Sequence, residues 1–413
     1  MTEASNNSPI ILAFSGGLDT SFCVPWLKET YGRPVVTVCI NTGGLDADAA
    51  QHLEARALAL GAQEHVLVEA RQQFFDRVIR YLIAGNVRRG QLYPLCVGAE
   101  RGIQATLLAE IATARGSDTV AHGCTAAGND QVRFEVALRT INPALAVLAP
   151  VRDESFVRAE QVAYLEDKGF PVAGKSSDYS INRGLWGVSI GGKETLDSFG
   201  SLPEDAWVLS PGALDDPRAP ATHTIGFHQG IPITLDGTQM NPVALIEALE
   251  QLAGPFGIGR GIHLGDTVLG TKGRVAFEAP AAEVLLTAHR ELEKLTLSAL
   301  QMRIKEGVAS SYGDFVHEGK QLDAVCRDIE ALLESSQRHV TGEVKVQFRT
   351  GSVFIEGVDS PHSLMAATKG VYGEAAGEWT PADALGYSRI LSLTGMLQTR
   401  AAAHANTPEK TAK

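Results

Sequence analysis

The sequence predicts an α/β fold, in which a doubly wound parallel sheet is followed by a second, α+β domain and a C-terminal helix. Through residues 1–170, short apolar runs alternate with longer stretches of helical periodicity, which is the pattern of βαβ units. The apolar runs are nearly continuous, as in strands that helices cover on both faces. After Phe170 the connections become rich in Gly, Pro and Ser. We therefore expect domains at residues 1–170 and 171–380, with a helical tail at 381–413.

Five apolar runs are the predicted strands of the first sheet. They cover residues 10–14, 35–40, 65–68, 118–122 and 145–149. Helices are predicted in the gaps between them. Ala49, Leu53 and Ala57 recur at helical spacing before Gly61, and residues 75–82 repeat the pattern.

The second domain and the tail give weaker signals. Hairpins are predicted at residues 224–235 and 343–356, and helices at 243–252 and 281–305. The tail carries a helical stretch at 391–403 and then a polar end at 406–413, which we expect to fray. A terminal helix after a compact domain often packs on a neighbouring subunit, so we expect a homo-oligomer.

The composition disfavours several classes of protein. A chain of 413 residues with 44% apolar and 20% charged residues is long enough for a large core. Its net charge of −12 disfavours nucleic-acid binding, because nucleic-acid-binding proteins display basic surfaces. No apolar run approaches the ~20 residues that span a bilayer, and residues 1–8 lack the pattern of a signal peptide. We therefore expect a cytoplasmic protein without membrane contact.

The cysteines and histidines of the sequence do not predict a metal-binding site. Five cysteines without a Cys-x-x-Cys pair predict reduced thiols rather than disulfides or structural zinc. The histidines are scattered, and even His223 and His228 lack the spacing that places two imidazoles on one helix face. No metal held by protein ligands alone is expected.

The first predicted strand runs into a glycine-rich turn, which reads Ser15-Gly16-Gly17-Leu18-Asp19-Thr20-Ser21. The glycines permit unusual φ angles and let backbone N–H groups close on an anion, the hydroxyls add donors, and the following helix adds its partial positive charge. The turn therefore predicts a phosphate site. Asp19 would repel a bare phosphate, so it indicates either Mg²⁺ bound with a nucleotide or an N-capping carboxylate. The alternative is a tight strand-to-helix turn that binds nothing.

The strand at residues 118–122 leads into a second glycine-bounded loop and a helix. Thr125, Asn129, Asp130 and Arg133 cluster there, at the carboxyl end of a strand. Thr and Asn can donate to a carboxylate and Asp can hold an ammonium group, so this set suits an amino acid. The alternative is a helix capped by Asn129 or Asp130, with Arg133 in solvent.

Together the two loops resemble those of the argininosuccinate synthase family, in particular through the ending Leu-Asp-Thr-Ser of the first. That family joins citrulline to aspartate, so the resemblance implies an AMP-forming ligase of arginine biosynthesis that uses ATP with Mg²⁺ and assembles as a homotetramer. The implied ATP site consists of Ala13, Phe14, Ser15, Gly16, Gly17, Leu18, Asp19, Thr20, Ser21 and Gly123. The implied substrate site consists of Thr125, Asn129 and Asp130 for aspartate, and of Asn129, Arg133, Tyr93, Ser180 and Ser189 for citrulline. A packing role fits Tyr93 equally well.

The chain departs from the family pattern at several positions. Ala126 and Ala127 stand where the family has a Gly-Lys pair, so a cation that could neutralise phosphate charge is absent. Gly98, Gly265 and Phe277 align with a serine, a glutamate and a tyrosine that contact citrulline. Glycine in place of glutamate removes an anion and opens space, which suits an acceptor whose α-amino group is acylated. An N-acylated citrulline is therefore an alternative acceptor.

The implied chemistry assigns the protein a positioning role. A urea has no leaving group, so its oxygen must be adenylated before an amine displaces it, while the protein orients three ligands and stabilises phosphate charge. No residue is an obvious covalent nucleophile, Cys124 is interpreted as a small filler, and the catalytic residues are unassigned. Asp130 and the departing pyrophosphate are both candidates for the base that deprotonates aspartate.

Two other classes of protein share the first loop. Enzymes that adenylate tRNA bases carry it, but the acidic composition and the second loop argue against them. A non-catalytic descendant that senses ATP or an amino acid is the other alternative.

Overall fold

The computed structural model describes residues 8–170, 172, 178–374 and 376–405. Residues 1–362 form one compact unit and residues 363–413 form a second. The polar ends predicted at residues 1–7 and 406–413 lie outside the described part.

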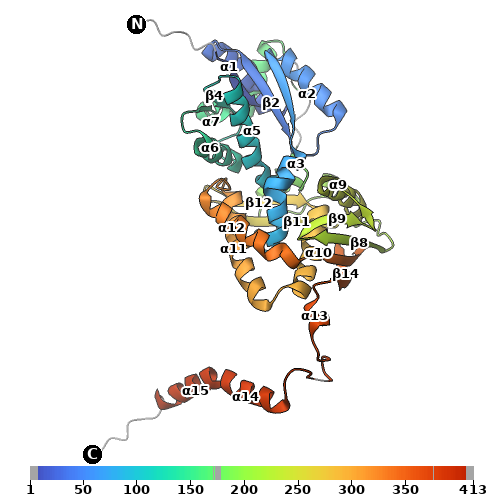
Figure 1. Ribbon diagram of the computed structural model, residues 1–413. Coiled ribbons are helices and arrows are strands. Elements are labelled where there is room, and N and C mark those ends of the chain that lie inside the picture. The colour runs from blue at the N-terminus through green and yellow to red at the C-terminus, as the bar shows by residue number, and fades with distance from the viewer. Residues whose placement is uncertain (1–7, 171, 173–177, 375, 406–413) are drawn as a thin grey trace, which may run out of the picture. The chain divides into compact units, whose positions relative to one another are not determined.

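A five-stranded parallel sheet organises the first half of the larger unit (Figure 1). Its strand order is β3-β2-β1-β4-β5, and every neighbouring pair is parallel. The strands are β1 (Ile10–Ala13), β2 (Val35–Asn41), β3 (Glu64–Glu69), β4 (Thr119–Ala121) and β5 (Ala146–Leu148). The predicted doubly wound sheet is confirmed, with a strand at each of the five predicted places.

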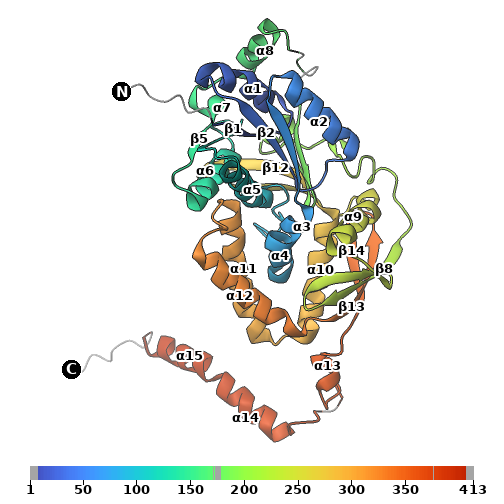
Figure 2. The ribbon, with the colours of Figure 1, turned by 45° about the horizontal axis from the view of Figure 1, so that its top comes forward.

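Helices cover both faces of this sheet (Figure 2). Because side chains alternate along a strand, Ile10 and Leu12 pack among the helices of one face, and Ile11 packs among those of the other. The first layer contains α1 (Leu18–Tyr31), α2 (Ala47–Ala59), α7 (Pro150–Asp153) and α8 (Arg158–Asp167). The second contains α5 (Arg101–Ala114) and α6 (Asn129–Ile141).

Two antiparallel sheets and a group of helices build the second half of the larger unit. One sheet has the order β11-β12-β7-β6 and the other β10-β9-β8-β13-β14. The strands are β6 (Ser180–Gly184), β7 (Gly187–Gly191), β8 (Ala221–His228), β9 (Ile231–Leu235), β10 (Thr238–Gln239), β11 (Arg260–Asp266), β12 (Lys272–Glu278), β13 (Gly342–Arg349) and β14 (Ser352–Asp359). Both predicted hairpins are present, as β8–β9 and β13–β14.

The helices of this half differ from the prediction in two places. They are α3 (Arg71–Phe74), a π-helical turn (Phe75–Ile79), α4 (Arg80–Gly85), α9 (Pro242–Ala253), α10 (Pro280–Thr296), α11 (Ala299–His317) and α12 (Ala324–Ser336). The single helix predicted at residues 281–305 is wrong, because Ser298 accepts a hydrogen bond from the Gln301 N–H and starts a new helix. The helix predicted at 75–82 begins as a π turn. Short 3₁₀ turns occur at Gly98–Glu100, Lys193–Leu196, Glu204–Ala206, Gly254–Phe256 and Gln337–His339.

The smaller unit is helical. It contains α13 (Leu364–Ala367), α14 (Pro381–Leu391) and α15 (Leu393–Ala405). The helix predicted at residues 391–403 is present and is preceded by a second one, which starts at a capping box between Thr380 and Asp383. No residue of these three helices is buried.

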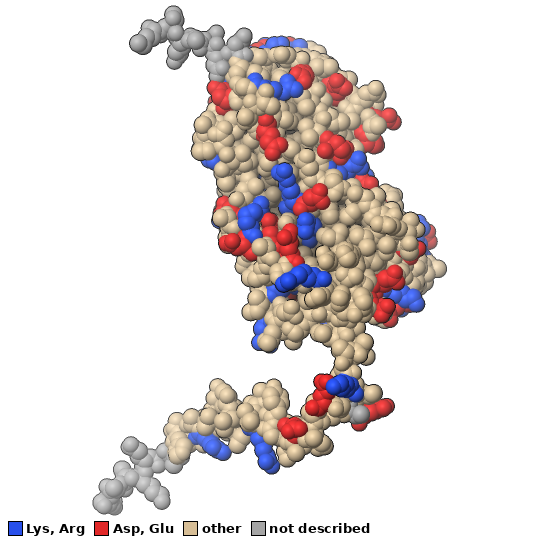
Figure 3. Space-filling view, in the orientation of Figure 1, with Lys and Arg blue, Asp and Glu red and all other residues tan. Residues whose placement is uncertain are grey.

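The surface carries both signs of charge. On the face drawn in Figure 3, Lys and Arg alternate with Asp and Glu, and no broad area of positive charge is visible. None of the described helices is both long enough and apolar enough to cross a membrane.

Candidate active site

The two polar loops meet at the carboxyl edge of the parallel sheet. They follow β1 and β4, which are neighbours in the sheet although the chain turns from them in opposite directions. Such a switch point is where open α/β sheets bind ligands. A Cβ atom added to Gly123 in the second loop would lie 3.0 Å from the Thr20 nitrogen in the first. The loops are therefore in contact.

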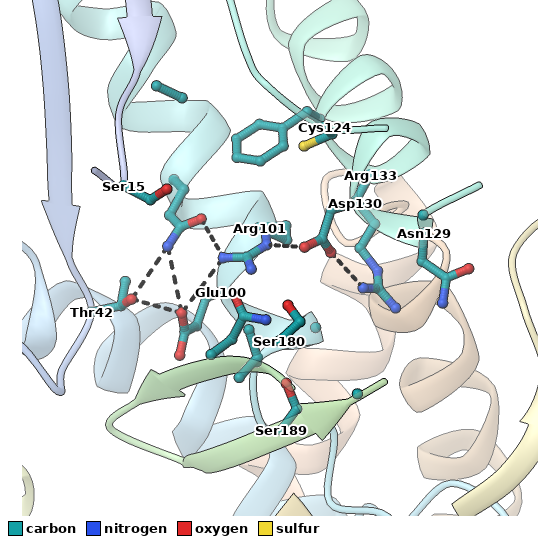
Figure 4. Close-up of a pocket in the computed structure, with 18 of the residues that line it drawn as sticks. Ser15, Thr42, Glu100, Arg101, Cys124, Asn129, Asp130, Arg133, Ser180 and Ser189 are labelled. Carbon is teal, nitrogen blue, oxygen red and sulfur yellow. Dashed lines mark hydrogen bonds and ion pairs between the residues drawn. The ribbon is translucent and has the colours of Figure 1, made fainter. Parts of the chain in front are cut away.

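A cavity of about 830 Å³ opens at this edge, a size suited to small-molecule ligands (Figure 4). Its wall includes these residues of the predicted ATP site: Ala13, Phe14, Ser15, Gly17, Asp19, Thr20 and Gly123. It includes all seven residues of the predicted substrate site: Tyr93, Thr125, Asn129, Asp130, Arg133, Ser180 and Ser189. Gly16, Leu18 and Ser21 belong to the first loop but do not line the cavity.

The first loop presents hydrogen-bond donors to the cavity. Gly16 has a φ of +74°, and Gly17 precedes α1 without any side-chain cap, so the first N–H groups of the helix have no side-chain partner there. Ser21 is buried behind the loop, where its hydroxyl donates to the Gly16 carbonyl and accepts from Arg56 Nε at 2.9 Å. Ser21 and Arg56 therefore brace the turn, while its backbone and Ser15 face the ligand space.

Asp19 is free to act on a ligand. Its carboxylate forms no hydrogen bond and no ion pair with any described residue, and Gly17 rather than Asp19 holds the N-cap position. The N-capping alternative for Asp19 is therefore wrong. A single carboxylate beside nucleotide phosphates is a usual way for proteins to hold Mg²⁺, so this donor fits that ion. In the described part of the chain no three His, Cys, Asp or Glu side chains gather into a metal-binding group.

Arg133 and Asp130 form an ordered ionic cluster. Arg133 is 6% exposed and donates through Nη1 to Asp130 at 2.8 Å and through Nε to the His317 carbonyl at 2.7 Å. Arg101 forms a second ion pair with Asp130 at 2.9 Å, so Asp130 lies between two guanidinium groups (Figure 4). Burial favours the neutral carboxyl, but the two arginines outweigh it and lower the pKa of Asp130 to about 2. The alternative with Arg133 in solvent is wrong.

Asn129 and Tyr93 link the cavity to the second half of the unit. The Asn129 side-chain oxygen accepts from the backbone N–H of Val268 at 2.9 Å, which leaves its NH₂ group as the ligand-facing donor. Tyr93 is 7% exposed, and its ring stacks on His263 at 5.5 Å and contacts Phe277 at 5.2 Å. Tyr93 is therefore both a packing residue and a part of the cavity wall.

Ser180 and Ser189 reach the cavity from one hairpin. They lie on β6 and β7, and β7 pairs with β12 so that Ser189 stands beside Phe277. The hairpin is attached to the parallel sheet by a hydrogen bond of 2.9 Å from the Leu185 N–H to the Thr42 carbonyl. This contact brings the second sheet to the carboxyl edge of β2.

Comparisons with known proteins identify the family of this chain. The family model described as the arginosuccinate synthase N-terminal HUP domain matches residues 9–171, and that of the arginosuccinate synthase C-terminal domain matches residues 179–398. The chain belongs to the argininosuccinate synthase family. It is 38% identical to the argininosuccinate synthase of Xylella fastidiosa over 97% of this chain and 98% of that one. It is 39% identical to the argininosuccinate synthase of Xanthomonas campestris over 95% of this chain and 98% of that one. It is 38% identical to the argininosuccinate synthase of Methanocaldococcus jannaschii over 86% of this chain and 89% of that one.

Two departures from the argininosuccinate synthase pattern have structural explanations. A Cβ atom at Gly265 would lie 2.5 Å from His263 Nε2 and 3.1 Å from an Arg89 nitrogen. A Cβ atom at Gly98 would lie 3.1 Å from the Arg133 guanidinium. The expectation that glycine opens space at position 265 is therefore wrong, because nitrogen-bearing side chains occupy that volume.

Several cavity residues of this argininosuccinate synthase family member were not predicted. Glu100 is 2% exposed and accepts from the Thr42 hydroxyl at 2.8 Å, and burial raises its pKa to about 8 against the opposing effects of Arg101 and Thr42. A charged Glu-Arg pair at the start of an apolar helix was the available signal for Glu100 and Arg101. Arg89 and His317 carry no local signal, because only the tertiary fold brings them to the cavity.

Proposed function

We propose that this protein is an AMP-forming ligase that condenses citrulline with aspartate, giving argininosuccinate, AMP and pyrophosphate. Membership of the argininosuccinate synthase family supports this activity. The single observation that carries the site assignment is that the phosphate-type turn and every expected substrate residue line one cavity.

In the proposed reaction the ureido oxygen of citrulline attacks the α-phosphorus of ATP, and the bond to pyrophosphate breaks. The N–H groups at the start of α1 and the Ser15 hydroxyl would receive that pyrophosphate. The aspartate amine then attacks the ureido carbon, the carbon–oxygen bond to AMP breaks, and one proton leaves the nitrogen. Asn129 and Arg133 would orient the reacting groups from the other side of the cavity.

The proton from aspartate has two candidate acceptors. Asp130 is held ionised by Arg101 and Arg133, and a carboxylate with a pKa of about 2 is a weak base at neutral pH. We therefore assign the proton to the departing pyrophosphate and give Asp130 the role of fixing both arginines.

The missing Lys at position 127 requires another source of positive charge beside the phosphates. Asp19 would hold Mg²⁺ bound with ATP, which supplies that charge. Arg56 adds a second positive group behind the turn through its hydrogen bond to Ser21. We further propose a homotetramer in the cytoplasm.

Formation of AMP and pyrophosphate tests the function. Both products are expected to appear only when ATP, Mg²⁺, aspartate and a ureido acceptor are all present. Asp19→Asn should raise the Mg²⁺ concentration needed for half-maximal rate, whereas Asp48→Asn, on the exposed first turn of α2, should not. Tight ATP binding without turnover would support the sensor alternative instead.

A further inference from the structure

The cavity wall around Gly265 carries a positively charged hydrogen-bond donor, whereas a glutamate would be a negatively charged acceptor. The volume that a side chain at position 265 would enter holds His263 Nε2 and Arg89 Nη1, which lie 3.4 Å apart. Burial, and then the charge of Arg89, lower the pKa of His263, so its ring is neutral and its Nε2 accepts from the guanidinium. A carboxylate acceptor is thus replaced by a cationic donor.

Arg89 has unused hydrogen-bonding capacity. Its side chain is 18% exposed, and its buried Nε has no hydrogen-bond partner among the described residues. Its ion pair with Asp314 spans 3.6 Å, which is longer than a hydrogen bond, and Asp314 is 56% exposed. A guanidinium has five N–H donors and Arg89 lines the cavity, so the Nη donors that His263 does not use are available to a ligand there.

The residues at positions 98 and 277 also make this end of the cavity less suited to an ammonium group. The Arg133 guanidinium occupies the volume beside Gly98, and Phe277 carries no hydroxyl. Asp266, the carboxylate next to Gly265, is paired with Lys272 at 2.5 Å. An ammonium group beside Gly265 would therefore face two guanidinium groups, while the neighbouring carboxylate of Asp266 is already paired.

We infer that this ligase prefers a citrulline whose α-nitrogen is acylated over citrulline itself, and that Arg89 recognises an oxygen of the acyl group. This rests on the proposed function, since it concerns the acceptor of the same ligase reaction. Acylation removes the positive charge that Arg89 and Arg133 would repel, and it adds an oxygen that accepts from the unused donors. Arg89 is then a residue that determines specificity, with His263 positioning it.

Four acceptors separate the possibilities in an assay of pyrophosphate release by the full chain. They are citrulline, N-acetylcitrulline, N-succinylcitrulline and 5-ureidopentanoate, which lacks the amino group. The acyl compounds should exceed citrulline in kcat/KM by about 10- to 100-fold, which is the contribution of one hydrogen bond to a charged group. Preference for the succinyl compound would identify a carboxylate as the group bound, and equal rates would identify the amide oxygen.

A kcat/KM for citrulline equal to that for the acyl compounds would overturn the inference. A kcat/KM for 5-ureidopentanoate equal to theirs would also overturn it. Absence of turnover with every acceptor would contradict the proposed function. In that case calorimetric titration with N-acetylcitrulline and citrulline still decides the inference, which requires tighter binding of the acyl compound.

Substitution of Arg89 tests its role directly. Arg89→Met should lower the ratio of kcat/KM for N-acetylcitrulline over citrulline by about tenfold or more. The matched control is Arg80→Met, which removes an arginine paired with Glu334 outside the cavity and should leave the ratio unchanged. If Arg89→Met does not fold, Arg89→Lys keeps the charge but loses the planar fork, and the ratio should still fall. An unchanged ratio in the folded variant would overturn the assignment.

Discussion

The side-chain oxygen of Asn129 accepts a hydrogen bond of 2.9 Å from the backbone N–H of Val268. Asn129 is the first residue of α6, and Val268 lies in the turn between β11 and β12, so the bond joins the parallel sheet's helices to the second sheet. It also fixes the direction of the amide, because the oxygen is committed to the protein and the NH₂ group is left for a ligand.

Replacement of Asn129 by Asp separates these two functions. Asn129→Asp keeps an oxygen that can accept from Val268 but removes both N–H donors, so kcat/KM for aspartate should fall by about 10- to 100-fold while the melting temperature changes little. Asn129→Ala should lose the activity and also about 1 kcal/mol of stability, since the Val268 N–H loses its partner. Steady-state kinetics and thermal unfolding measure both, and full activity of the Asp variant would show that the NH₂ group touches no substrate.

Asp130 should matter for binding and not for proton transfer. Asp130→Asn leaves Arg101 and Arg133 without their shared carboxylate, so we expect a higher KM for aspartate and a loss of about 1–3 kcal/mol in the free energy of unfolding. Because the pKa of Asp130 is about 2, the wild-type pH–rate profile should show no ionisation of this group above about pH 4. A wild-type inflection between pH 5 and 8 that Asp130→Asn abolishes would restore Asp130 as the base.

The fold could be predicted largely from the sequence because its main elements have local causes. Strands buried on both faces, such as residues 10–14, read as continuous apolar runs. The division between α10 and α11 was missed because apolar periodicity continues through it, although Ser298 and Gln301 are a capping box that marks a new helix.

Only part of the site could be predicted by the same reasoning. The turn at Ser15 and the cluster from Thr125 to Arg133 are contiguous in sequence, so their chemistry shows in the residue pattern. Arg89 and His263 are 174 residues apart and meet only through tertiary packing. A glycine in the sequence likewise shows that a side chain is missing, but not which neighbouring residue fills the volume. At Gly265 the neighbouring residues determine the chemistry of the cavity wall.

Glu100 should make the stability of the protein depend on pH. Burial raises the pKa of Glu100 to about 8, so the folded chain keeps a proton that the unfolded chain releases above about pH 4.5. The contribution of this group to stability is therefore complete below about pH 4.5 and is lost as the pH rises to about 8. Glu100→Gln is neutral throughout and keeps an acceptor for Thr42.

The test compares denaturant unfolding of wild type and Glu100→Gln across this range. The free energy of unfolding of the variant should rise relative to wild type between about pH 5 and 8, and Glu110→Gln, an exposed residue of α5, should run parallel to wild type. Parallel curves for Glu100→Gln would mean that Glu100 is already ionised in the folded protein.

We expect the smaller unit to supply the surface for the proposed self-association. Ile390, Leu393 and Leu397 recur at spacings of three and four along α14 and α15, and their side chains are 74%, 48% and 52% exposed. Exposed apolar rows of this kind are typical of faces that pack on another subunit. The double variant Ile390→Glu/Leu397→Glu should lower the sedimentation coefficient from that of an oligomer towards that of a single chain. Ser388→Glu adds one such negative charge at a polar position of α14 and should leave the coefficient unchanged. A double variant that sediments like wild type would exclude these helices from the interface.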